Sequence, residues 1–319
     1  EITSNKGSVL KYKLDNFYLK PYQTVFYNLR DIVDYSKFLK DDYGTYSLSF
    51  NVGGIFPRII VGNIDNKTKA WSIDHSNFAD EKGASSLDVF KVSKDNNFKN
   101  LVFSVPNNYK DKWECFADIY PTYPGDNYNI VSNQILNNKV VSSKKIKISK
   151  KNNLIFPRIE FSKNLHHEVE FEHNNTLPNR FHMGIHYRIN NGPTAFLTDG
   201  PLPHNTPGIR TRWLPIFEND ICDNYLMIAN RSLGSEKAKE VNFNVELYNE
   251  SLDLPLIKSL KINPNESVCF SINEIFSDSS KFLGNKCGWL YMTSNEPQRC
   301  NIHYASVKNN SSIALDHAF

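Results

Sequence analysis

The side chains best suited to binding a metal ion gather in the middle of the sequence. Segment 166–173 carries three histidines and three glutamates, and His182 and His186 follow it. Neutral imidazoles and carboxylates are common ligands of divalent metals. On a strand, however, His182 and His186 would lie about 13 Å apart, too far to hold one ion. The sequence therefore leaves two interpretations, a solvated acidic strand or a divalent metal site, for which the candidate ligands are His173, His182 and His186.

A second group of reactive side chains lies in segment 198–213, which is rich in proline and glycine and which we interpret as a loop. Such a composition is typical of a linker between domains. Long ordered loops also carry binding sites, and arginine beside tryptophan suits anionic or sugar ligands. The predicted ligand contacts in this loop are Asp199, His204, Arg210, Arg212 and Trp213.

Other Asp and His residues are better explained by the fold. The pairs 74–75 and 316–317 are both Asp-His. Adjacent residues on a strand point to opposite faces, so one pair cannot easily chelate one ion, and an Asp at a strand end commonly caps its own backbone. His186 and His303 each lie between Ile and Tyr, so both should face outward if those neighbours face the core.

No diagnostic catalytic motif is present in the sequence. It contains no serine-nucleophile, Walker or dinucleotide-binding motif, and the five cysteines form no CxxC pair that would indicate structural zinc. Cys287 and Cys300 flank a predicted hairpin in which Cys300 faces Thr293, so no disulfide is expected between them. Scattered thiols fit a reducing compartment slightly better than an oxidising one.

Composition narrows the class of protein. The 319 residues suffice for two or three domains, and 40% hydrophobic residues with 21 Phe and 16 Tyr can build real cores. A net charge of +3 gives no electrostatic case for nucleic acid. A lysine-rich run near residues 144–151 alternates with isoleucine and is predicted to be an exposed strand.

No stretch reaches the roughly 20 apolar residues of a transmembrane helix. The chain begins at Glu1 without a signal-like segment, which fits a cytoplasmic protein, or a cell-surface or secreted one whose targeting segment lies outside this chain.

Internal similarity predicts the architecture. Segments 19–33 and 260–276 share one pattern of alternating apolar residues and turns, and Gly44 then aligns with Gly288. Segment 146–161 is a weaker middle copy. Period-two alternation between turn signals is typical of half-buried antiparallel strands. Each copy is followed by a predicted hairpin with an Asn-rich turn, since asparagine tolerates the positive φ of short hairpins.

The sequence thus predicts an all-β chain of tandem antiparallel β-sandwich units, with a jelly roll as the alternative. The first copy is incomplete, because only the second half of the repeat is present. The strands at 101–106 and 113–120 of the second copy are aligned with those at 226–232 and 241–248 of the third. The predicted units are 1–85, 86–205 and 206–319.

For function, the sequence favours a non-enzymatic or accessory binding module, associated with carbohydrate, a cell surface or another protein. The first alternative is an enzyme, either metal-dependent or metal-free, with a His/Asp/Arg site at the junction of the second and third units. The second alternative is a purely structural subunit of an oligomer.

Overall fold

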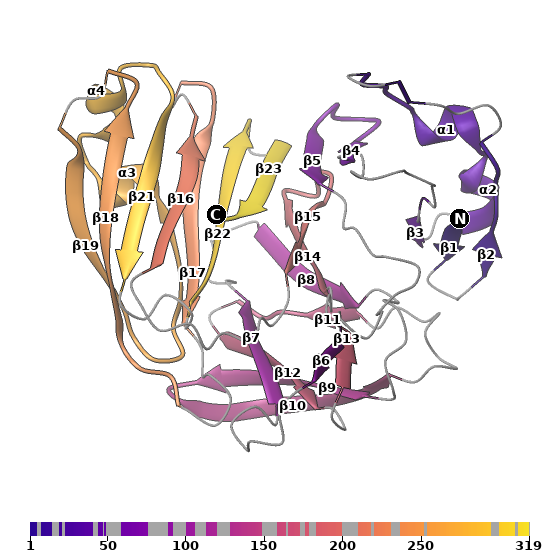
Figure 1. Ribbon diagram of the computed structural model, residues 1–319, viewed down its shortest axis with the longest axis horizontal. Coiled ribbons are helices and arrows are strands. Elements are labelled where there is room, and N and C mark those ends of the chain that lie inside the picture. The colour runs from indigo at the N-terminus through magenta and orange to yellow at the C-terminus, as the bar shows by residue number, and fades with distance from the viewer. Residues whose placement is uncertain are drawn as a thin grey trace.

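Most of the described residues form β-strands in several mainly antiparallel sheets, as a computed structural model shows (Figure 1). None of the described helices exceeds five residues, and none has the length or apolar composition to cross a membrane. The all-β prediction is therefore confirmed. The structure describes residues 1–4, 8–14, 19–20, 23–40, 44–46, 48, 59–75, 89–91, 100–105, 113–119, 128–148, 158–163, 165–172, 176–178, 183–199, 210–217, 220–230, 237–251, 254–294, 300–309 and 312–318.

The C-terminal part of the chain forms two facing sheets. We call the first the outer sheet; in spatial order its strands are β16 (Arg210–Ile216), β21 (Gly288–Ser294), β18 (Val241–Asn249) and β19 (Leu256–Ile262). We call the second the central sheet; its strands are β20 (Ser267–Ser271), β17 (Asp223–Asn230), β22 (Cys300–Lys308), β23 (Ser312–His317), β5 (Trp71–His75) and β4 (Ile60–Ile64).

The middle of the chain also forms two four-stranded sheets. The β8 sheet contains β11 (Arg158–Glu160), β8 (Trp113–Ile119), β14 (Met183–Ile189) and β15 (Ala195–Asp199). The β9 sheet contains β10 (Lys139–Ile148), β9 (Tyr128–Leu136), β12 (His166–Glu172) and β7 (Asn100–Val105). The lysine-rich strand predicted to be exposed is β10, the edge strand of its sheet, and its described lysines are exposed.

The remaining elements are small. β2 (Val9–Leu10), β1 (Ile2–Ser4) and β3 (Gly44–Tyr46) form one sheet, and β13 (Thr176–Pro178) pairs with β6 (Val89–Lys91). The helices are α1 (Leu29–Ile32), α2 (Tyr35–Leu39), α3 (Ile272–Ile275) and α4 (Ser279–Leu283).

The central sheet has a hydrophobic core on each face. On β17, Leu226 and Ile228 belong to the core shared with the outer sheet, whereas Met227 belongs to the core shared with the β8 and β9 sheets. All three side chains are fully buried. Because both faces are covered, apolar residues occupy successive positions of this strand, where a half-exposed strand would alternate.

This two-sided burial corrects the prediction for His303. Its ring is fully buried and its Nδ1 lies 3.3 Å from the hydroxyl oxygen of Tyr187. His303 therefore faces the core shared with the β8 and β9 sheets and not solvent. For His186 the prediction is only partly confirmed: Ile185 and Tyr187 enter the core and His186 lies on the opposite face of β14, but its side chain is only 13% exposed.

The two large groups of strands share one strand order. The middle group in chain order is β7 to β12, β14 and β15, and the C-terminal group is β16 to β23. If the strands of each group are numbered one to eight along the chain, each group forms two sheets. One sheet has the strand order 4-3-6-1 and the other has the order 5-2-7-8, and this holds for both groups. By this order β7 corresponds to β16 and β8 to β17. The sequence alignments of 101–106 with 226–232 and of 113–120 with 241–248 are therefore both displaced by one strand, because the proline and glycine of segment 198–213 resemble a loop and conceal β16.

Three predicted hairpins are present as β4–β5, β14–β15 and β22–β23. Asn190, Asn191 and Asn309 adopt the positive φ expected of their turns. The hairpin β4–β5 does not stand alone, since β5 pairs in parallel with β23, with Ser72 opposite Ile313. Strands from the N-terminal and C-terminal ends of the chain thus share the central sheet.

The predicted hairpin between Cys287 and Cys300 is wrong. β21 pairs with β16 and β18 in the outer sheet, whereas β22 pairs with β17 and β23 in the central sheet. The chain crosses from one sheet to the other after Ser294, which places the two strands on opposite sides of one core. All five cysteines are free thiols.

Candidate functional site

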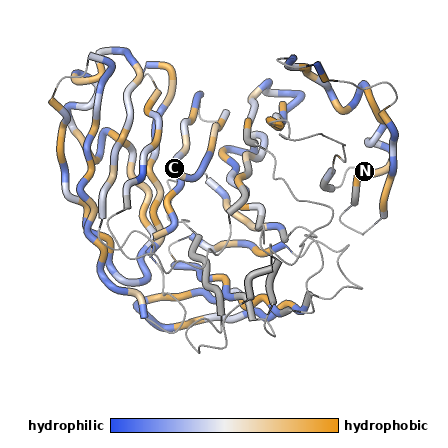
Figure 2. Tube along the Cα trace, in the orientation of Figure 1, coloured by the Kyte–Doolittle hydropathy of each residue, from blue (hydrophilic) through white to orange (hydrophobic). Residues whose placement is uncertain are grey.

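The exposed face of the outer sheet carries a row of aromatic side chains. Along β21, Leu290 and Met292 enter the core, while Trp289 and Tyr291 point to the opposite face and are half-buried. The hydropathy of the chain alternates in the same way along these strands (Figure 2). Trp213 on β16 lies on this face and is 50% exposed. Period-two alternation therefore separates a core face from an aromatic outer face.

Strand register brings these aromatic residues together. Trp213 lies directly opposite Tyr291, which in turn lies opposite Glu246 on β18. In the next row, Trp289 lies opposite Tyr248. Directly opposed residues of antiparallel strands have Cβ atoms about 4.5–5.5 Å apart, so the four rings form one continuous surface over three strands. We call this set, Trp213, Tyr248, Trp289 and Tyr291 with Asn244 and Glu246, the aromatic face.

Hydrogen bonds fix the orientation of the polar groups on this face. The Tyr248 hydroxyl donates to Glu246 Oε2 at 2.6 Å, and Asn244 Nδ2 donates to Glu246 Oε1 at 2.8 Å. The hydrogen bond to the carboxylate raises the pKa of Tyr248. The rings of Tyr248 and Trp289 stack with centroids 5.3 Å apart and an interplanar angle of 5°. The polar groups and the stacked rings of this face are therefore held in place by one another.

The chemistry of the aromatic face suits ligands that are apolar on one side and polar around the edge. Indole and phenol rings offer flat apolar surfaces, and a carboxylate and an amide beside them accept and donate hydrogen bonds. A pyranose ring has this character, because C–H groups cover one face while hydroxyls project from the rim. The described residues of the face supply one carboxylate and no cation.

The predicted ligand residues are dispersed. Trp213 belongs to the aromatic face, whereas Arg212 lies opposite Met292 and so projects toward the other face of β16. Arg210 is the first residue of β16, Asp199 is the last residue of β15 in another sheet, and His204 lies outside the described residues. The loop is also shorter than predicted, because its two ends belong to strands.

The predicted metal ligands can be placed only in part. His173 and His182 lie outside the described residues, and His186 lies on β14. Its Nε2 is 3.4 Å from Asp118 Oδ2, and Asp118 also accepts two hydrogen bonds from Arg158, at 3.0 and 3.2 Å. Within the ranges the structure describes, no group of three or more His, Cys, Asp or Glu side chains could hold a metal ion.

The surroundings of His186 favour a neutral ring. It stacks on Phe116 with centroids 4.7 Å apart, and the Arg158 guanidinium lies over the same phenyl ring. Burial lowers the pKa of His186 to about 4; the Asp118 carboxylate opposes this shift and Arg158 adds to it. The carboxylate is thus already neutralised by arginine, and this polar cluster serves the packing of the β8 sheet.

The Asp-His pairs behave as structural elements where they are described. Asp316 Oδ1 accepts the backbone N–H of His317 at 2.8 Å. This is the local capping expected of an Asp near a strand end. The side chains of the equivalent residues 74 and 75 lie outside the described part of the chain.

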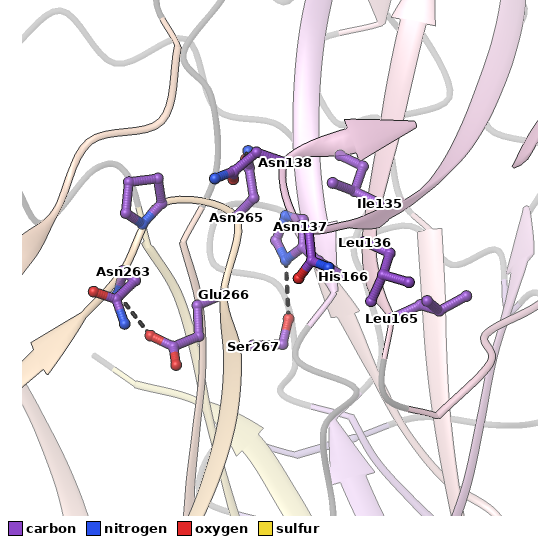
Figure 3. Close-up of a pocket in the computed structure, with 11 residues that line it drawn as sticks. Ile135, Leu136, Asn137, Asn138, Leu165, His166, Asn263, Asn265, Glu266 and Ser267 are labelled. Atoms are coloured by element: carbon purple, nitrogen blue, oxygen red, sulfur yellow. Dashed lines mark hydrogen bonds between the residues drawn. The ribbon is translucent and has the colours of Figure 1, made fainter. Parts of the chain in front are cut away.

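A polar pocket of about 300 Å³ lies where the β9–β10 turn meets the β19–β20 turn (Figure 3). Two contacts cross it: Asn265 Nδ2 donates to Asn138 Oδ1 at 2.9 Å, and His166 Nδ1 lies 3.1 Å from Ser267 Oγ. These contacts join the middle sheets to the C-terminal sheets. We interpret the pocket as a joint between the two groups of strands.

Sequence reasoning missed three of the four rings of the aromatic face. The signal was present in segment 289–292, where Trp-Leu-Tyr-Met alternates aromatic and aliphatic residues. Without the strand register, nothing connected these rings with Trp213 or Tyr248. No protein-family model matches the chain, and no curated protein matches it, so the aromatic face rests on its own geometry.

Proposed function

We propose that the chain is a non-catalytic carbohydrate-binding protein built from tandem β-sandwich units, and that the aromatic face is its binding site. The units follow the division 1–85, 86–205 and 206–319, with the first incomplete. The observation that carries the proposal is the aromatic face itself, four rings over three strands of one sheet with an ordered carboxylate among them.

Two structural features support the repeat. One is the shared order 4-3-6-1 and 5-2-7-8 of the middle and C-terminal strands. The other is local: α1 and α2 precede β3 as α3 and α4 precede β21. The second helix of each pair ends in a left-handed residue, Lys40 or Gly284, whose N–H donates to the carbonyl of Ser36 or Ser280.

The repeat also provides a comparison for the aromatic face. By strand order, β12 of the middle unit corresponds to β21. On β12, Val169 enters the core and the opposite side carries His166, Glu168 and Glu170, of which the first two are buried, where β21 has Trp289 and Tyr291. The same position in the fold is thus compatible with charged residues. The aromatic residues of β21 are therefore not required to build a sheet of this kind, which favours a binding role.

The ligand class follows from the charge and shape of the face. An aromatic surface that extends over three strands suits an extended chain of sugar rings better than a single small molecule, which usually needs a concave pocket. The only charged member of the face, Glu246, already accepts hydrogen bonds from Tyr248 and Asn244. A neutral polysaccharide fits this face better than an acidic one, which the carboxylate would repel.

A printed glycan array followed by calorimetry with the best oligosaccharide tests the proposal. We expect binding to neutral glycans, and we expect Trp213→Ala and Tyr291→Ala each to weaken it at least tenfold, or about 1.4 kcal/mol, because each removes a ring that stacks on the ligand. Both side chains lie outside the core, so thermal unfolding should change little.

Tyr12→Ala is the matched control, since Tyr12 is 57% exposed and lies outside the aromatic face. It should bind like the unchanged protein. Absence of binding to every glycan, or equal binding by the Trp213 and Tyr291 variants, would rule out the proposal. Binding of a protein partner lost in the same two variants would instead identify the face as a protein interface.

A further inference from the structure

The outer edge of the central sheet ends in an exposed and uncharged strand. No described strand pairs with the far side of β4. Its side chains Ile60 and Ile64 are 69% and 66% exposed. Register places them on one face with Trp71 and Ile73 of β5, which are 42% and 43% exposed. Unpaired backbone groups beside an apolar face are a ready template for another strand.

The other large-sheet edges that the structure describes are protected. The edge strand β10 carries four lysines and a bulge, β19 carries two lysines, and β16 carries two arginines and a proline. β11 is a three-residue strand with an arginine and a glutamate. β7 and β15 lie against strands of the central sheet, and β20 is half-buried. Charges and proline are the usual means of blocking edge pairing, and β4 has neither.

The strand order indicates what belongs beside β4. In both complete groups the seventh strand, β14 or β22, pairs antiparallel with the second strand, β8 or β17. β4 and β5 form the hairpin that corresponds to the seventh and eighth strands, and β5 continues the central sheet beside β23. The outer side of β4 is therefore a position that an antiparallel strand occupies elsewhere in this chain.

The sequence of β4 is complementary to itself. It reads Ile-Val-Gly-Asn-Ile, with an isoleucine at each end and Gly62 at the centre. In an antiparallel pair of two such strands centred on Gly62, each Ile60 would face an Ile64 of the second copy. We propose that two copies of this chain associate through β4 about a two-fold axis, which joins their central sheets into one continuous sheet.

The geometry at the axis supports this pairing. Gly62 has no side chain to separate the two backbones, and among the described residues an added Cβ would meet only Ser72 and Ile73 of β5 within 4 Å. The added apolar neighbours would partly cover Ile60 and Ile64 of both copies. The resulting dimer carries two aromatic faces, so it would bind a polysaccharide with increased avidity. The pairing itself does not depend on what the aromatic face binds.

Analytical ultracentrifugation over a range of micromolar concentrations tests the pairing. We expect the unchanged protein to dimerise and the double variant Ile60→Lys, Ile64→Lys to remain monomeric, since both side chains are exposed in the single copy. The double variant Lys258→Ala, Ile257→Lys is the matched control on the exposed edge strand β19, and it should dimerise normally. A monomeric unchanged protein, a dimer that survives the β4 change, or a dimer lost in the control would each overturn the proposal.

A cysteine cross-link gives a readout that does not depend on the lysine variants folding. A Cβ atom added at Gly62 would meet its nearest neighbour, the Ser72 carbonyl oxygen, at 3.6 Å, which is ordinary contact. Antiparallel partners lie within disulfide reach of each other. Under mild oxidation Gly62→Cys should form a covalent dimer, while the unchanged protein with its five native cysteines should not. Equal cross-linking of the two proteins would contradict pairing at β4.

Discussion

Two histidines, the fully buried His167 and the largely covered His186, are held in the neutral form. His167 is fully buried, its Nε2 lies 3.2 Å from the Ser162 carbonyl oxygen, and its Nδ1 has no hydrogen-bond partner among the described residues. Nε2 therefore carries the proton and donates, and a second proton on Nδ1 would find no acceptor. Burial lowers the pKa of His167 to about 4, as it does for His186.

These two residues predict a loss of stability in mild acid. Their pKa is about 6.5 when unfolded and about 4 when folded, so the unfolded chain binds protons first as the pH falls. Stability should therefore decrease from pH 6.5 down to about pH 4, by about 3 kcal/mol for each histidine. Chemical denaturation measures the free energy of unfolding across this pH range. In His167→Gln and in His186→Gln this free energy should fall less steeply with decreasing pH than in the unchanged protein. An unchanged slope in both variants would contradict the assignment of neutral histidines.

At the scale of the element, the recurring glycine at the start of β21 has a steric cause. A Cβ atom on Gly288 would lie 2.3 Å from the Tyr248 carbonyl oxygen and 2.6 Å from Leu283 Cδ2. Real contacts of a Cβ atom are essentially never that short, so helix α4 and strand β18 would have to move away from residue 288. The close approach of these elements explains why the sequence requires glycine at this position.

Gly288→Ala is accordingly expected to lower the free energy of unfolding by about 3 kcal/mol, the usual scale for overpacking a core. Gly62→Ala is the comparison, since its added Cβ has ordinary contacts, and its effect should stay below about 1 kcal/mol. Urea unfolding of both variants measures the difference. Comparable stability of the two variants would contradict the steric explanation.

The elements that could be predicted from sequence are those with local signals. Alternation predicted the strands, and asparagine-rich turns predicted the three hairpins; positive-φ asparagines occur in the β14–β15 and β22–β23 turns, whereas Lys69 has the positive φ in the β4–β5 turn. The crossing between sheets after Ser294 has no local signal, because only the hydrogen-bond partners distinguish it from a hairpin turn. β16 was hidden by the arginines and the proline that protect its edge, which made the strand resemble part of a loop.

The candidate site, too, could be predicted from the sequence only where its signal is local. Trp213 stands out in the sequence beside its arginine neighbours, but Tyr291 and Tyr248, its neighbours on the aromatic face, lie 78 and 35 residues further along the chain. The metal hypothesis arose from local density of histidines, which says nothing of the distances between side chains. Only strand register, a long-range property, brings the rings together.

At the scale of the whole molecule, the central sheet is the middle layer of the structure. The outer sheet covers one of its faces, and the β8 sheet packs on part of the other (Figure 1). The aromatic face lies on the side of the outer sheet turned away from both cores. This arrangement leaves the proposed binding surface open while its supporting strands are rigidly packed.

Oxidation of tryptophan, with each site identified by mass spectrometry, tests the central claim most directly. Trp213, Trp289 and Trp71 are accessible to different degrees, whereas Trp113 is buried. A saturating neutral oligosaccharide should protect Trp213 and Trp289 and leave Trp71 as reactive as before. Protection of Trp71 alone, or equal oxidation with and without a bound oligosaccharide, would contradict binding at the aromatic face.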